Sequence, residues 1–411
     1  MHVTIDPPPG QWTPPVAGEQ GVVIATGHQA WLWHPGILAK LFAMQAAAEL
    51  FRGRMCYFVV DQDVHEALMF EQPRLEGDRL TVEHIRLGEQ QADVPTGLHP
   101  PVKLNTSQVR DERVREALDA TTGDSLAEQM TSALMDLIDP LMGKAPVRYV
   151  SKLPEDARYR SFVELMIADA RGCAEAYNAT LREAAVHDVA ALRVGDESVE
   201  LPLWHCAWGK PRRRVYVSDG KPVGANGDEI SSDALLLPRA LTLSAVIRSL
   251  YSALFIHGIG GGVYDRATEQ WWQKWRGEAL SPMAVVSADL TLDFDVPVAG
   301  RAELDRAIWR RHHLRHNLDP DKGELLRQMS ASNDRAERAA VFRAIHEANA
   351  HAAAADPKPL READRAIARA RAGLANAAAA AKRDWCFALY PREKLIALCD
   401  AIAARVDTIQ P

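Results

Sequence analysis

A short polar motif, Thr26-Gly27-His28-Gln29, follows directly after the apolar run 22–25 and precedes a segment with the pattern of a helix, 35–50. A buried strand that turns at a glycine into a helix is typical of parallel α/β proteins. At such a turn, polar side chains and free backbone N–H groups gather at one edge of the sheet, where ligands bind. The motif therefore favours an α/β fold with a candidate site just after its first core strand.

A second strand of the same kind follows that helix. Residues 55–60 are apolar, and they end in Asp61-Gln62-Asp63-Val64-His65-Glu66, a concentration of ionisable groups that a core strand does not need. If the strand continued, Asp61, Asp63 and His65 would project to one side, because side chains alternate along a strand. We therefore expect the two strand ends to converge on one crevice.

The pattern of strand followed by helix returns later in the chain. Residues 235–238 lead into a helical segment, 242–249, and the apolar run 253–256 leads into Gly258-Ile259-Gly260-Gly261-Gly262 and a tryptophan-rich helix, 265–275. Between about 72 and 230, alternating and helical patterns indicate inserted β and helical segments. We expect a Rossmann-like parallel-sheet core over residues 1–300 that carries these insertions.

The character of the chain changes past about residue 300. Residues 324–350 and 360–382 are charged, alanine-rich helical segments, and the turn 355–359 between them is typical of a helical hairpin. We expect a short coiled-coil arm over 301–384, with 385–411 returning to the core. The close packing that alanine permits indicates a seam within one chain or between the two copies of a homodimer.

Composition and charge exclude several classes of protein. The 411 residues carry a formal net charge of −7, which argues against a general nucleic-acid binder. No apolar stretch reaches the roughly 18 residues that a membrane-spanning helix needs, and no signal-peptide pattern opens the chain, so we expect a cytoplasmic protein without a membrane partner. The 5 cysteines are scattered, which favours neither a disulfide framework nor a cysteine-based zinc site.

Several motifs, in this order, resemble the cysteine-adding enzymes of bacillithiol biosynthesis, the BshC-like cysteine ligases. That family has a T-G-Q-Q turn after the first core strand, an acidic and histidine-containing run after the second, an R-P segment, a glycine-rich strand end followed by tryptophan, and a C-terminal coiled coil. The corresponding stretches here are Thr26–Gln29, Asp61–Glu66, Leu237-Pro238-Arg239, Gly260–Gly262 through Trp271-Trp272, and the closing segment Phe387–Leu395.

The resemblance implies a Rossmann-type core and an enzyme that joins cysteine to the amine of a glucosaminyl malate. This chain departs from the family pattern at three positions. His28 stands where the family has glutamine, Gln62 where it has histidine, and His65 where it has an acid. These departures leave open the actual pair of small-molecule substrates and whether activity is kept, redirected or lost.

The residue types at the two strand ends suit proton transfer and charge stabilisation. We expect His28 to steady developing negative charge, and Asp61 or Asp63, with His65 nearby, to take a proton from an attacking amine. Thr26, Gly27, Gln29 and Glu66 would line the same crevice. Each role has a structural alternative. His28 could be a turn histidine that bonds only to a neighbouring carbonyl, and Asp61 or Asp63 could only cap backbone N–H groups.

Further residues are candidates for binding substrate or nucleotide. Arg239 could hold a carboxylate in a bidentate fork, with a surface salt bridge as the alternative. Backbone N–H groups of Gly258, Gly260 and Gly261 could meet an anionic group, with His257 and Asp265 as polar neighbours, or the glycines could form only a packed turn. The basic run Lys210 and Arg212–Arg214 is typical of a solvated face.

The sequence leaves the cofactor open. It does not decide whether ATP activates the acid. If it does, we expect Mg²⁺ held more by phosphates than by protein, and no dedicated protein metal site is expected. Two other functions remain as alternatives, namely a non-catalytic ligand-binding or assembly protein, and a metal-dependent hydrolase that uses the Asp and His cluster.

Overall fold

The computed structural model describes the chain except for residues 9–10, 13–14, 17–20, 185–188, 232 and 409–411. The chain divides into two compact units. Unit 1 comprises 1–72, 84–290 and 383–411, and unit 2 comprises 73–83 and 291–382. The boundary expected at residue 300 therefore lies ten residues earlier, and part of the inserted β segment belongs to unit 2.

Unit 1 is built on a six-stranded sheet with the order β1-β12-β11-β2-β3-β6. Strands β12, β11, β2, β3 and β6 run parallel, and β1 pairs antiparallel with β12 at the edge. The strands span β1 (His2–Asp6), β2 (Val23–His28), β3 (Arg54–Val59), β6 (Val147–Tyr149), β11 (Leu254–His257) and β12 (Met283–Asp289). An α/β fold with a parallel sheet is thus present as expected.

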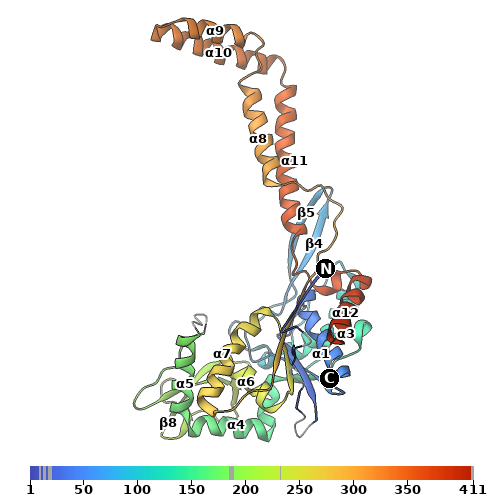
Figure 1. Cartoon of the computed structure of the whole chain (residues 1–411), viewed down its shortest axis with the longest axis vertical. Coiled ribbons are helices and arrows are strands. Elements are labelled where there is room, and N and C mark those ends of the chain that lie inside the picture. Colours follow the sequence, from blue (N-terminus) through green and yellow to red (C-terminus); the bar gives the residue numbers. More distant parts are fainter. Residues whose placement is uncertain (9–10, 13–14, 17–20, 185–188, 232, 409–411) are drawn as a thin grey trace. The chain divides into compact units, whose positions relative to one another are not determined.

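Helices cover both faces of this sheet (Figure 1). Helix α1 (Pro35–Leu50) packs against β2 and β12, and α12 (Arg392–Val406) packs against α1. Helices α6 (Leu241–Leu250) and α7 (Ile259–Arg276) lie against β11 on the other face. The carboxyl ends of β2, β3 and β11 therefore open at one edge, between two helical layers.

Helix α1 is apolar over most of its surface, which is why nearly all of it is buried. It begins with Pro35 at the first helical position, and Nδ1 of His34 accepts a hydrogen bond from the N–H of Gly36 at 3.1 Å. The expected helix 35–50 is confirmed residue for residue. His34 therefore acts as the helix cap.

A second, antiparallel sheet in unit 1 has the order β10-β7-β8-β9. Its strands are β7 (Val199–Cys206), β8 (Arg213–Ser218), β9 (Lys221–Val223) and β10 (Leu235–Pro238). The prediction that 235–238 returns to the parallel sheet was wrong, because β10 pairs antiparallel with β7. A short apolar run before a helix fits either sheet, and its pattern does not name its partner.

The inserted region of unit 1 also carries helices, as expected. They are α2 (Glu112–Asp119), α3 (Leu126–Met142), α4 (Ala157–Ala168) and α5 (Ala170–Glu183), together with the 3₁₀ turns η2 (Thr96–Leu98) and η3 (Val150–Glu155). A further 3₁₀ turn, η4 (Phe387–Leu389), precedes α12. Helices α4, α5 and α7 bury aromatic side chains in one core, where the rings of Phe162 and Trp272 stack at 5.9 Å.

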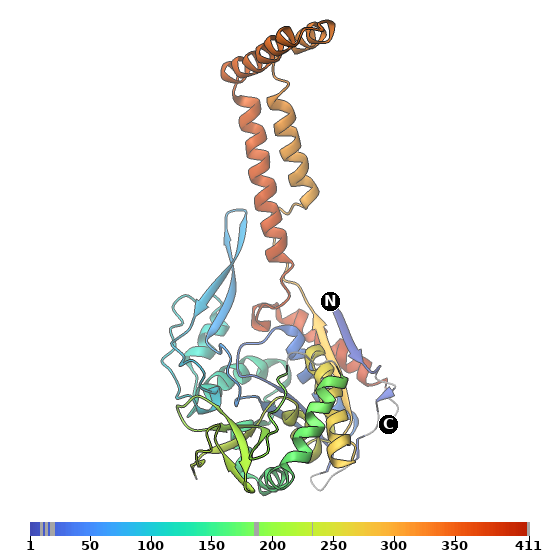
Figure 2. The same ribbon diagram turned by 90° about the vertical axis from the view of Figure 1, so that its left-hand side faces the viewer.

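The hairpin of β4 (Met69–Glu76) and β5 (Arg79–Arg86) confirms a β insertion, and its tip belongs to unit 2. The helices of unit 2 are α8 (Arg301–Arg315), α9 (Lys322–Ala331), α10 (Arg335–Ala355) and α11 (Lys358–Ala380). Helix α11 packs along α8, and α10 packs along α9 (Figures 1 and 2). The expected hairpin on either side of the turn 355–359 is therefore replaced by two separate helix pairs.

None of the helices among the described residues combines the length and the apolar character that a membrane crossing requires.

Candidate functional site

The polar ends of β2 and β3 lie side by side. In the parallel register His28 pairs with Val59, so the residues that follow each strand emerge at the same edge of the sheet. There Nε2 of Gln29 donates a hydrogen bond to Oδ2 of Asp63 at 3.2 Å. This bond joins the two sequence motifs that were predicted to converge.

Asp63 also forms an ion pair with Arg212, which the sequence pattern had placed on a solvated face. Nη1 of Arg212 donates to Oδ1 of Asp63 at 2.9 Å, and the N–H of Val64 donates to the same oxygen at 2.9 Å. The guanidinium of Arg212 lies over the ring of Trp204 at 4.4 Å. Both Asp63 and Arg212 keep part of their side chains exposed, at 33% and 25%. The carboxylate is held in place and still faces solvent.

His28 is half-buried at the end of β2. The indole N–H of Trp31 donates to its Nδ1 at 3.3 Å, and the two rings stack at 6.0 Å. Because an indole N–H can only donate, Nδ1 accepts and the imidazole proton sits on Nε2. Burial lowers the pKa of His28 well below its usual range, and the charge of Lys40 lowers it further. His28 is thus a neutral donor at physiological pH.

His65 lies next to this pair. Its Nε2 lies 3.3 Å from the carbonyl oxygen of Ala30, and its Nδ1 is buried and has no hydrogen-bond partner among the described residues. Burial lowers the pKa of His65, against the opposing effects of the Ala30 carbonyl and Asp63. With the proton on Nε2, Nδ1 is a free acceptor. His65 and the exposed Glu66 also line a cavity of about 370 Å³.

Two predicted site residues are structural instead. Asp61 is fully buried, and its carboxylate accepts hydrogen bonds from the backbone N–H of Ser151 at 2.8 Å and from the Ser151 hydroxyl at 2.5 Å. Burial raises the pKa of Asp61 to about 6, against the hydrogen bonds from Ser151. Thr26 is also fully buried, and its hydroxyl donates to the carbonyl of Ile256 at 2.7 Å. Neither side chain can touch a substrate.

Gly27 is needed for the close approach of β2 and β3. A β-carbon at this position would lie 2.9 Å from the carbonyl oxygen of Phe58, a contact too short for any side chain. The Gly27 carbonyl itself accepts a hydrogen bond from Lys40. Gly27 thus allows β2 and β3 to pack closely, and its carbonyl is accessible to Lys40 of α1.

Arg239 is not free to hold a substrate carboxylate. Its Nη1 donates to Oε1 of Glu200 at 2.8 Å, and Glu200 is fully buried and also bound by Arg214. Its guanidinium lies over Trp204 at 4.6 Å, and Arg212 also lies against that ring. The alternative ion-pair interpretation holds, although the pair is buried rather than on the surface. Arg212, not Arg239, brings a guanidinium to the strand ends.

The glycine-rich segment after β11 forms the first turn of a helix rather than a loop. Gly258 is the N-cap of α7 and provides no side-chain cap, while Gly260 and Gly261 are exposed. A β-carbon on Gly261 would lie 2.7 Å from Nδ1 of His257, so the absence of a side chain lets the imidazole lie beneath this turn. The first N–H groups of α7, which no side chain caps, thus lie at the carboxyl edge of the sheet.

His257 is fixed from below by a buried ion-pair network. Its Nε2 lies 2.7 Å from Oδ2 of Asp265, which is also 2.7 Å from Nη1 of Arg248. Burial would raise the pKa of Asp265, but hydrogen bonds and charges from His257 and Arg248 outweigh it and lower the pKa. Asp265 is only 1% exposed, so it positions His257 and does not line the crevice.

Lys40 was not predicted as a site residue from the sequence. It lies on α1 with 4% of its surface exposed, and its Nζ donates to the Gly27 carbonyl at 2.7 Å. Burial lowers the pKa of Lys40 to about 7. A signal was present in the sequence, because Lys40 is the single basic residue of a helix whose other residues, apart from Gln45 and Glu49 near its end, are not polar.

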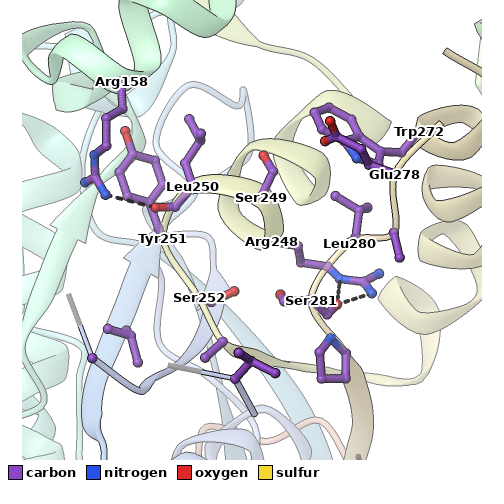
Figure 3. Close-up of a pocket in the computed structure, with 16 residues that line it drawn as sticks. Arg158, Arg248, Ser249, Leu250, Tyr251, Ser252, Trp272, Glu278, Leu280 and Ser281 are labelled. Carbon is purple, nitrogen blue, oxygen red and sulfur yellow. Dashed lines mark hydrogen bonds between the residues drawn. The ribbon is translucent and has the colours of Figure 1, made fainter. Parts of the chain in front are cut away.

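A larger cavity opens at the opposite, amino edge of the same sheet (Figure 3). It measures about 520 Å³, and its wall includes Val23 at the start of β2 and Pro282 just before β12. Figure 3 shows Arg248 bonded to the carbonyl of Ser281. Because Arg248 also binds Asp265, this cavity and the turn above His257 share one ion-pair network.

Among the described residues, no group of three or more His, Cys, Asp or Glu side chains is arranged to hold a metal ion. No protein-family model matches this chain, and no curated protein matches it significantly.

Proposed function

We propose that this chain is a BshC-like ligase, which joins the carboxyl group of cysteine or a related acid to the amine of an amino sugar such as glucosaminyl malate. The observation that carries the proposal is the hydrogen bond between Gln29 and Asp63, which joins the ends of two parallel strands. In this proposal the unit 1 sheet is a Rossmann-like core, the unit 2 helices form the coiled-coil arm of a homodimer, and the protein acts in the cytoplasm.

The chemistry requires an activated acid. Joining a carboxylate to an amine forms a C–N bond and releases an oxygen of the acid, so the oxygen needs conversion into a better leaving group. ATP with Mg²⁺ would supply that activation as a phosphoryl group. The free N–H groups of the first α7 turn, which has no side-chain cap, fit an anionic group of this kind.

Two side chains at the strand ends suit the remaining steps. Asp63 would accept the proton that the amine loses as it attacks, because its carboxylate is oriented by Arg212 and Gln29 and remains partly exposed. His28 would donate its Nε2 proton in a hydrogen bond to the carbonyl oxygen as negative charge develops there. The neutral state of His28 suits this role, since its lowered pKa keeps the proton on one nitrogen only.

A non-catalytic ligand-binding protein is the second candidate. Asp63 accepts hydrogen bonds from Arg212, Gln29 and the Val64 N–H, and a carboxylate held by three donors also suits a site that binds without turnover. Such a protein would bind one of the substrates and form no product.

Product formation tests the proposal. Purified full-length protein would be incubated with cysteine, glucosaminyl malate, ATP and MgCl₂, and the condensed thiol followed by mass spectrometry. We expect His28→Ala to reduce the rate about 100-fold, since one oxyanion donor contributes on this scale. His84→Ala, at an exposed histidine of β5, is the matched control. Ligand binding without any product from the wild type would favour the second candidate.

A further inference from the structure

Lys40 is a buried lysine that no carboxylate balances among the described residues. Its Nζ bonds to the Gly27 carbonyl, and within the part of the chain that the structure describes it has no ion-pair partner. A lysine in such surroundings costs free energy unless an opposite charge offsets the loss of hydration. The side chain is therefore expected to serve a ligand, because packing alone would be better served by an apolar residue.

The position of Lys40 indicates where that ligand lies. Ile256 pairs with Thr26 in the register of β11 and β2, so the segments that follow these strands emerge next to each other. The Cδ atom of Lys40 lies 3.8 Å from the place that a β-carbon on Gly258 would take. The aliphatic part of Lys40 thus lies against the start of α7, while its ammonium group bonds to the carbonyl of Gly27 near the end of β2.

The start of α7 offers the complementary donors. The helix spans Ile259–Arg276, and its N-cap Gly258 has no side chain to satisfy the first N–H groups. Those groups carry the partial positive charge of the helix N-terminus. Gly260 has open space on its outer side, because among the described residues no atom beyond its own turn of helix lies within 4 Å of an added β-carbon. An anionic group can therefore approach the backbone directly.

We propose that Lys40 and the first turn of α7 form a binding site for an oxyanion group, either a phosphate or a carboxylate, of a substrate. The buried ammonium faces the anion from the side of α1, and the backbone N–H groups of 259–261 face it from α7. The role of this site in catalysis rests on the proposed ligase function. Its binding of an anion does not.

Anion binding is measured without any substrate turnover. Isothermal titration calorimetry of the full chain would use sulfate, which has the tetrahedral shape of phosphate, and malonate, which presents carboxylates of the same total charge. We expect saturable binding of at least one probe, and the tighter probe identifies the ligand group. The absence of saturable binding of either probe below about 50 mM would overturn the proposal.

Three variants locate the site. Lys40→Met should weaken anion binding at least tenfold while the protein stays as heat-resistant as the wild type or more so, because a buried unpaired charge is removed. Ile259→Pro removes one free N–H at a position where proline fits a helix start, and the extended Gly258 tolerates a following proline. We expect about tenfold weaker binding for Ile259→Pro and no change for Ile259→Ala.

The pH profile separates Lys40 from its neighbours. His28 on β2, His34 before α1 and His257 on β11 lie close to this site, and the pKa values of His28 and His34 are lowered by burial. Between pH 7 and pH 9 Lys40 loses its proton, since burial lowers its pKa to about 7. Sulfate binding should therefore weaken by up to about tenfold per pH unit in the wild type, and much less in Lys40→Met.

The outcomes distinguish this site from the ligase function. Anion binding that is lost in Lys40→Met, in a protein that forms no product, would support the site and reject the ligase. Product formation by a protein whose anion binding is unchanged in Lys40→Met and Ile259→Pro would support the ligase and overturn the site.

Discussion

Gln29 donates a hydrogen bond to Asp63 across the carboxyl ends of two parallel strands. The bond matters because each residue belongs to a different sequence motif, and the motifs are separated by the whole of α1. It fixes the direction of the Asp63 carboxylate, which Arg212 approaches from the second sheet.

Arg212 should position Asp63 for catalysis. Arg212→Ala removes a charge-assisted hydrogen bond, and we expect about tenfold lower kcat/KM with a change in unfolding free energy below about 1 kcal/mol, because the pair is partly exposed. Product formation and thermal unfolding would be measured together. The exposed neighbour Arg213→Ala is the control, and an equal loss of activity in both variants would refute a specific role.

Lys40 should make stability depend on pH in a defined direction. Burial lowers the pKa of Lys40 from its usual value of 10.5 to about 7 in the folded state, so the unfolded chain binds the proton more tightly between these values. Folding therefore becomes more favourable as pH rises from 7 towards 10.5, by about 2 kcal/mol between pH 7 and pH 9. Below pH 7 the effect is constant.

Comparison of the wild type with Lys40→Met isolates this effect. Urea unfolding at pH 7, 8 and 9 should show the advantage of Lys40→Met shrinking as pH rises. A difference that stays constant across this range would mean that Lys40 does not titrate there.

The pairing of Asp265 with Arg248 and His257 should be essential to the fold. Asp265→Asn leaves the buried guanidinium of Arg248 with reduced compensation, and we expect a loss of about 3–5 kcal/mol in unfolding free energy. Glu269→Gln is the matched control, because Glu269 binds the same arginine with a side chain that is 44% exposed, and it should cost less than about 1 kcal/mol. Both variants would be measured by guanidinium unfolding. A similar loss of unfolding free energy in Asp265→Asn and Glu269→Gln would contradict this prediction.

Thr26 should contribute to stability and not to activity. Thr26→Val keeps the shape of the side chain but leaves the buried Ile256 carbonyl without the hydroxyl donor, at a cost of about 1–2 kcal/mol. The rate of product formation per folded molecule should stay within about twofold of the wild type. A large loss of activity at unchanged stability would place Thr26 in the site after all.

Local patterns predicted much of the unit 1 core. The helix 35–50 and the strands on either side of it were predicted because their apolar runs and the Pro35 start signal are local. The convergence of Gln29 and Asp63 followed from the parallel arrangement alone. What failed depended on partners far along the chain, which periodicity does not encode.

Asp61 and Asp63 show this limit most clearly. Both follow β3 and look equivalent in the sequence, but Ser151 binds Asp61 from a turn 90 residues away, and Arg212 binds Asp63 from the second sheet. Likewise, Arg239 was expected at the crevice, because nothing local indicates that β10 pairs with β7 or that Glu200 is buried beneath it. Tertiary packing, not residue type, separates the partly exposed carboxylate of Asp63 from the buried carboxylate of Asp61.

The most direct test of the site compares the same substitution at these two carboxylates. Product formation from cysteine and glucosaminyl malate would be measured for the wild type, Asp63→Asn and Asp61→Asn, with thermal unfolding as a check on folding. We predict a loss of at least about 100-fold for Asp63→Asn and a rate within about threefold of the wild type for Asp61→Asn. Equal rates for the wild type and Asp63→Asn, or a selective loss in Asp61→Asn, would contradict the assignment of Asp63 as the proton acceptor.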